Sequence, residues 1–154
     1  MIDPARWQLA QFNVARLLVP IDHPQVADFV DNLDRVNELA EATPGFVWRL
    51  QSDSGNATDI EVEDDEMMIV NMSVWADPES LFDFTYRTSH AEIMRRRAEW
   101  FEARVEMHLV LWWVPAGHEP SLDEALDRLG KLRANGPTSE AFTLRDRFDP
   151  PVEA

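Results

Sequence analysis

Cysteine is absent from this chain of 154 residues, which excludes disulfides, thiolate nucleophiles and cysteine metal ligands. Long apolar runs are also absent, and none approaches the roughly 20 residues that a membrane-spanning helix needs. The first residues lack the basic segment followed by an apolar one that marks a secretory signal. We therefore expect a cytoplasmic protein.

Lysine is scarce and acidic residues are abundant. Lys131 is the single lysine among 14 basic residues, against 29 acidic ones, and the formal net charge is -15. Such a surface repels phosphate backbones and anionic membranes, so we expect neither nucleic acid nor membrane as a partner. Apolar residues make up 45% of the chain, which is enough for a packed core.

The length fits one domain of ordinary size. We expect a single domain over residues 1–154, with its core at about 8–134 and a C-terminal tail at 135–154. The tail is expected to add a short edge strand or to lie across the domain.

Hydrophobic periodicity predicts seven elements in the order strand, helix, strand, strand, helix, strand, helix. Strands are predicted at 8–19, 46–50, 67–76 and 108–115, and helices over 26–42, from 78 with a break near 87–90, and from 122 to the turn at 135–137. The acidic segment 52–66 reads as an exposed loop. The order β-α-β-β-α-β with an extra C-terminal helix is the ferredoxin-like α+β arrangement.

The third and fourth predicted strands are apolar on both faces. Val110 and Trp112 point to one face, whereas Leu111 and Trp113 point to the other. Helices can bury one face, but the second face needs another cover, and the simplest is the same sheet of a second copy. We therefore expect a homodimer through the sheet face, in which two sheets form a dimeric α/β barrel.

Five motifs, in this order along the chain, resemble domain-of-unknown-function family 3291, and the resemblance runs from about Leu9 to Pro151. The resemblance implies a dimeric α/β barrel related to antibiotic-biosynthesis monooxygenases. It implies no activity, because the family has none assigned. The motifs are "LAQFNVARLL", "PGFVWRL", "MSVWADPESLFDFTYRTSHAEIMRRRAEWF", "VLWWVPAGHEPSLDEALDRL" and "GPTSEAFTLRDRF".

The candidate site is a small-molecule pocket between the sheet and the helices, because an aromatic cavity with a few polar groups is typical of such sites. Tryptophans can line the pocket or serve only as core and interface, since large aromatics bury roughly 150–250 Å² each. The candidate ligand-binding residues combine flat apolar surface with polar groups: Asn13, Trp48, Trp75, Arg97, Trp100, His108 and Trp112.

His90 and Tyr86 are the candidate catalytic residues. An imidazole can transfer a proton near neutral pH, although His90 can instead cap the helix that resumes there. The four histidines, at 23, 90, 108 and 118, are scattered along the chain, so no metal site is predicted.

Arg95, Arg96 and Arg97 follow one another and cannot all face inward. Arg97 lies nearest the Met94–Phe101 side of the helix, so it is the one expected to point inward. An inward arginine can bind a carboxylate of a ligand or of an internal acidic residue. In so acidic a chain an internal salt bridge is favoured.

Three functions remain open. The first is a cofactor-independent, monooxygenase-like enzyme acting on an aromatic substrate, for which no cofactor is predicted. The second is a haem-binding or haem-degrading protein, because Asn13, Trp75 and His90 fall on the elements that haem-degrading members of this superfamily use. The third is a non-catalytic, ligand-binding or structural homodimer.

Overall fold

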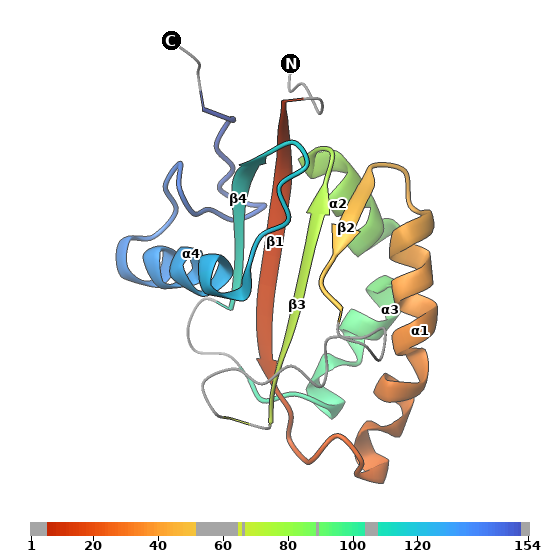
Figure 1. The fold of residues 1–154 in the computed structure, drawn as a ribbon. Coiled ribbons are helices and arrows are strands. Elements are labelled where there is room, and N and C mark those ends of the chain that lie inside the picture. Colours follow the sequence, from red (N-terminus) through yellow and green to blue (C-terminus); the bar gives the residue numbers. More distant parts are fainter. Residues whose placement is uncertain (1–5, 52–64, 66, 89, 104–107, 152–154) are drawn as a thin grey trace.

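Four strands and four α-helices follow one another in the predicted order. The computed structural model describes residues 6–51, 65, 67–88, 90–103 and 108–151 (Figure 1). Most of the acidic segment 52–66 lies outside the described residues. The elements are β1 (Trp7–Arg16), the 3-10 helix η1 (Pro24–Val26), α1 (Ala27–Ala42), β2 (Phe46–Arg49), β3 (Met68–Trp75), α2 (Pro78–Arg87), α3 (His90–Arg95), the 3-10 helix η2 (Arg97–Glu99), β4 (Leu109–Pro115) and α4 (Leu122–Asn135).

The strands form one antiparallel sheet in the order β2-β3-β1-β4. This is the ferredoxin-like topology that the order of elements predicts. β1 lies at the centre, where Asn13 is opposite Asn71 of β3 and Leu9 is opposite Trp113 of β4. In the described part of the chain, no helix has the length and apolar content needed to cross a membrane.

Side-chain caps fix where the helices begin. The Asp77 carboxylate accepts a hydrogen bond from the Ser80 amide at 2.8 Å, so α2 begins at Pro78, as predicted. The Ser121 hydroxyl caps α4 in the same way, at 3.1 Å from the Glu124 amide. Before α1, the His23 ring caps a 3-10 turn by accepting from the Gln25 amide.

α4 packs on part of one face of the sheet, which we call the closed face. The even-numbered side chains of β1, β3 and β4 form an apolar core there, and Phe12, Met72 and Trp112 are fully buried. Leu129 and Leu132 of α4 pack onto this core, and Figure 1 shows α4 beside β4, away from α1, α2 and α3. α4 thus covers part of the face for which the sequence analysis invoked a second copy, and the homodimer stays a prediction.

The C-terminal tail belongs to the core rather than lying outside it. The backbones of Leu111 and Phe142 exchange two hydrogen bonds, of 2.8 and 2.9 Å, at the free edge of β4. Phe142 is fully buried, and the Trp113 indole donates to the Phe148 carbonyl at 2.8 Å. The tail therefore pairs with the edge of β4 and packs against the sheet.

Candidate functional site

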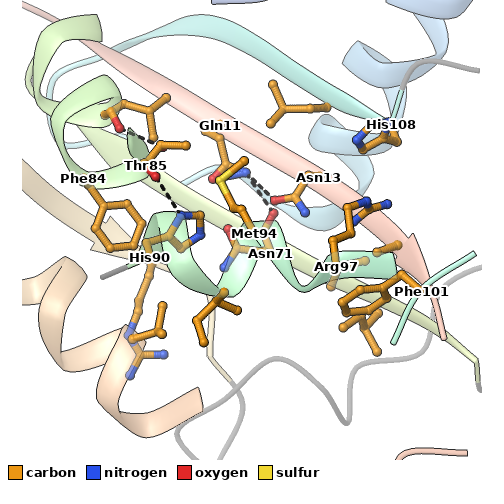
Figure 2. A pocket seen from close by; sticks show the side chains of 18 of the residues that line it. Gln11, Asn13, Asn71, Phe84, Thr85, His90, Met94, Arg97, Phe101 and His108 are labelled. Carbon is orange, nitrogen blue, oxygen red and sulfur yellow. Dashed lines mark hydrogen bonds between the residues drawn. The ribbon is translucent and has the colours of Figure 1, made fainter. Parts of the chain in front are cut away.

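A cavity of about 490 Å³ lies between the second face of the sheet and the helices α1, α2 and α3. Apolar side chains of α1 and of the α3 segment form its walls, among them Leu33, Val36 and Met94. Its floor is the middle of β1 and β3 (Figure 2). This cavity occupies the place where the sequence analysis predicts a pocket.

The floor is a chain of hydrogen-bonded polar groups. The Trp75 indole donates to the Ser73 hydroxyl at 2.8 Å, and this hydroxyl donates to the Gln11 side-chain oxygen at 2.9 Å. The Gln11 amide nitrogen in turn donates to the Asn13 side-chain oxygen at 2.8 Å. Gln11 and Ser73 are buried, and the chain supplies the partners that buried polar groups need.

The oxygen and nitrogen of the Gln11 amide are told apart only by their hydrogen-bond partners. With the two atoms exchanged, the nitrogen donates to the Ser73 hydroxyl at 2.9 Å and to the Asn71 side-chain oxygen at 3.0 Å. The oxygen then accepts from the Phe12 backbone amide at 3.2 Å and from the Asn13 backbone amide at 3.3 Å. In either assignment Gln11 is bonded to Ser73, so the polar floor is continuous.

His90 lies at the start of α3 and lines the cavity. Its Nδ1 is 3.2 Å from the Thr85 carbonyl oxygen. A carbonyl only accepts, so Nδ1 carries the proton and Nε2 keeps its lone pair. Burial lowers the pKa of the imidazole, and the Thr85 carbonyl offsets this only in part. His90 is therefore a neutral base, and its ring packs 4.7 Å from the Phe84 ring.

The backbone of His90 contributes to the helix break as well. Its amide donates to the Thr88 hydroxyl at 3.2 Å, between the end of α2 and the start of α3. This bond does not use the imidazole. The two roles that the sequence analysis weighed against each other, helix cap and pocket, therefore fall on different parts of the same residue.

Arg97 begins η2 and also lines the cavity. Its Nη2 atom is buried, and no hydrogen-bond partner for it is present in the described part of the chain. The guanidinium lies over the Phe101 ring, with Cζ 5.3 Å from the ring centroid. Burial lowers the pKa of this guanidinium.

The internal salt bridge expected for Arg97 is found at Arg96 instead. Arg96 binds Asp28 at 2.8 Å and Glu99 at 2.8 Å, and these hydrogen bonds, that to Glu99 first, raise its pKa. Neighbouring residues on a helix point about 100° apart, so only Arg97 faces the cavity. The predicted inward direction of Arg97 agrees with the structure, and its predicted salt bridge is wrong for the described residues.

Asn13, Tyr86, Trp100 and His108 line the cavity as well. Tyr86 stands at the rim, about half exposed at 49%, and its ring packs 4.8 Å from Phe82. Trp100 is buried at the opposite end, next to Phe29. Six of the nine candidate residues therefore meet in one place. Arg97 lies in η2 rather than in an α-helix, and Trp100 and His108 lie just outside the regular elements.

Trp48, Trp75 and Trp112 do not line this cavity, and the prediction that they do is wrong. Trp48 pairs with Val74 and Trp112 pairs with Ala10, so both side chains lie on the closed face. The Trp112 indole donates to the Glu124 carboxylate there at 2.9 Å.

Trp75 is on the cavity side of the sheet but is fully buried behind Phe84, whose ring stacks on it at 5.3 Å. Asn13 and His90 share the cavity whereas Trp75 lies outside it. The three-residue arrangement that motivated the haem-binding hypothesis is therefore not assembled.

The sequence analysis missed the polar floor. Gln11 and Asn71 line the cavity, and Ser73 links them to Trp75. A signal was available, because polar residues stand at alternate positions, 11 and 13 or 71 and 73, in strands that are otherwise apolar. That spacing places all four side chains on one face.

Comparison with known proteins identifies one family and several solved structures of similar fold and low sequence identity. A family model described as a domain of unknown function (DUF3291) matches residues 8–154. A search of curated proteins found no match.

Two solved structures illustrate the structural likeness. A protein of unknown function from Nitrosomonas europaea, NE2512, is similar with a TM-score of 0.46 and 17% identity, covering 77% of this chain and 99% of that one. SnoaB, a cofactor-independent oxygenase from Streptomyces nogalater, is similar with a TM-score of 0.47 and 13% identity, covering 75% of this chain and 96% of that one.

Proposed function

Because the chain belongs to the family described as a domain of unknown function (DUF3291), whose name assigns no activity, we propose its function from the cavity itself. The protein binds a small organic molecule between its sheet and the helices α1, α2 and α3. The observation that carries this proposal is the cavity of about 490 Å³, with apolar walls and a polar floor. Small-molecule sites have this size and composition.

One observation favours an enzyme over a passive binding protein, namely the neutral His90 with a proton on Nδ1 and a lone pair on Nε2. Such a base, held in place by the Thr85 carbonyl, accepts a proton from an acidic hydroxyl of a bound aromatic molecule. Transfer gives an imidazolium and a phenolate. The phenolate is the electron-rich form that molecular oxygen, the co-reactant, can oxidise without a cofactor.

Oxygen uptake tests the enzymatic part. The protein is mixed with a panel of polyphenols and quinols, and oxygen consumption is followed beside His90→Ala at equal concentration. We expect uptake by the wild type above the non-enzymatic rate and none above it in the variant. The variant keeps the bond from its own amide to Thr88 and loses only the imidazole bond to the Thr85 carbonyl, so its stability should fall by about 0.5–1.5 kcal/mol. If calorimetry shows that a compound binds but no oxygen is consumed, the protein binds its ligand without catalysis.

A homodimer through the sheet face completes the proposal. α4 packs at the β4 side of the closed face. A second copy would therefore pack against the β2–β3 side, where Trp48 and Met68 are partly buried. Light scattering at micromolar concentration is expected to give about twice the chain mass of 17.7 kDa. A stable monomer would contradict the dimer and leave the cavity proposal intact.

A further inference from the structure

The charges around the cavity are opposite in sign to those of the chain as a whole. Three arginines and two histidines line it, and the described lining residues include no aspartate or glutamate. The whole chain nevertheless carries a formal net charge of -15, from 29 acidic residues. A locally positive cavity favours an anionic ligand, and since the acidic exterior repels anions, this preference must come from the arginines of the lining.

Of these arginines, Arg49 already has an acidic partner, because its guanidinium lies 3.5 Å from the Glu41 carboxylate. Arg97 differs. Its Nη2 is buried with no partner in the described part of the chain, and its closest charged neighbour along the helix, Arg96, takes both Asp28 and Glu99. A guanidinium nitrogen that is buried without a hydrogen-bond partner is costly, which makes Arg97 the candidate for binding a ligand.

Resting on the proposed function, we propose that the ligand is an aromatic carboxylic acid whose carboxylate is bound by Arg97. Arg145, the third arginine of the lining, is exposed, whereas Arg97 has a buried guanidinium nitrogen, and a carboxylate is the planar partner that arginine binds best. The Phe101 ring beneath Cζ fixes the plane of the guanidinium. Apolar surface for the aromatic body comes from Met94 and Trp100, which line the same cavity.

Arg97 and His90 set the direction of the ligand. His90 begins α3 and Arg97 begins η2, and both side chains line the cavity. Figure 2 shows them at the two ends of one side, with Met94 and Asn71 between them. The proposed acid therefore has its carboxylate at Arg97 and its aromatic end toward His90.

A matched pair of probes tests the proposal by isothermal titration calorimetry. Naphthalene carboxylate and naphthalene carboxamide have the same shape and differ in charge. The wild type is expected to bind the carboxylate at least about tenfold more tightly, which equals about 1.4 kcal/mol. Arg97→Met should abolish this preference while still binding the amide.

Arg95→Met is the matched control, because it removes the same charge from the same helix at an exposed position outside the cavity lining. It should keep the preference for the carboxylate. If Arg97→Met does not fold, Arg97→Gln replaces it, since it also removes the charge but keeps a hydrogen-bonding side chain.

The outcomes separate the two proposals. Equal affinity of the wild type for both probes, or a preference that survives the loss of the Arg97 charge, would overturn the carboxylate assignment and leave small-molecule binding in place. Failure of the wild type to bind either probe would overturn both.

Discussion

The two faces of the sheet are built from the same strands but have different compositions. On the closed face, Phe12, Met72 and Trp112 are fully buried under α4, and the residues of the core are apolar throughout. On the cavity face, Gln11, Asn13 and Asn71 take the alternate positions of the same strands and leave space above them. Alternation in β1 and β3 thus places the packed apolar core on one face and the polar, open cavity on the other.

The difference shows why a cavity can persist in so small a domain. A close-packed core tolerates few voids, because each void loses van der Waals contacts. Here α4 and the C-terminal tail add apolar burial away from the cavity, with Leu129 and Phe142 almost fully or fully buried. The stability contributed there allows the cavity face to keep polar groups that do not pack. Substitutions on the two faces should therefore have separable effects.

The largest expected effect comes from placing a charge on each face. Val110→Asp buries an unpaired carboxylate at a fully buried position of the closed face, which costs several kcal/mol and should prevent folding. Asn71→Asp, at an exposed position on the cavity side, should change the free energy of unfolding by less than about 1 kcal/mol. Urea denaturation followed by circular dichroism measures both, and similar losses would abolish the distinction between the faces.

Truncation of adjacent residues in β1 gives a smaller contrast. Phe12→Ala leaves a cavity in the closed core, and such changes typically cost about 3–5 kcal/mol. Asn13→Ala removes one hydrogen bond, that from Gln11, and should cost about 0.5–1.5 kcal/mol while weakening ligand binding. Denaturation and calorimetry on the two variants test this. A larger loss of stability in Asn13→Ala would mean that the polar floor, rather than the apolar core, holds the sheet together.

The smallest expected effect is the pH dependence that His90 imposes on the cavity face. Burial places its folded-state pKa below the ordinary value of 6.5. As the pH falls from 6.5 to the folded-state pKa, the unfolded chain takes up the proton more readily, so stability falls through that window and is unaffected above it. His90→Gln should flatten this dependence in thermal melts between neutral and mildly acidic pH.

His90→Phe is a second variant for that titration, because it also removes the titrating group but keeps an aromatic ring beside Phe84. It should flatten the slope of stability against pH as His90→Gln does. An unchanged slope in both variants would show that other groups govern the acid response.

Periodicity predicted the elements well, because their signals are local. The Asp77 cap, the break before His90 and the strand pattern each depend on a few neighbouring residues. The placement of α4 could not be predicted in the same way. The leucines of α4 show that one side of the helix is apolar, but they do not show which surface that side covers. The sequence analysis therefore assigned the whole face to a second copy, although α4 covers part of it.

Within the site, the limits of prediction follow from geometry. His108 and Trp112 are both even-numbered, so a regular strand would place them on the same face. Only His108 lines the cavity, because it precedes the regular pairing that starts at Leu109. The sequence could not predict which arginine forms the salt bridges, because Arg96 and Arg97 have identical side chains. Only the folded helix shows which of the two reaches Asp28 and Glu99.

The neighbouring amides of Gln11 and Asn13 give the floor of the cavity both kinds of hydrogen-bonding group. The two side chains are 2.8 Å apart, and each amide carries two N–H donors and an oxygen that accepts. A hydrogen-bond donor and a hydrogen-bond acceptor placed above this pair can therefore each be satisfied without movement of the backbone.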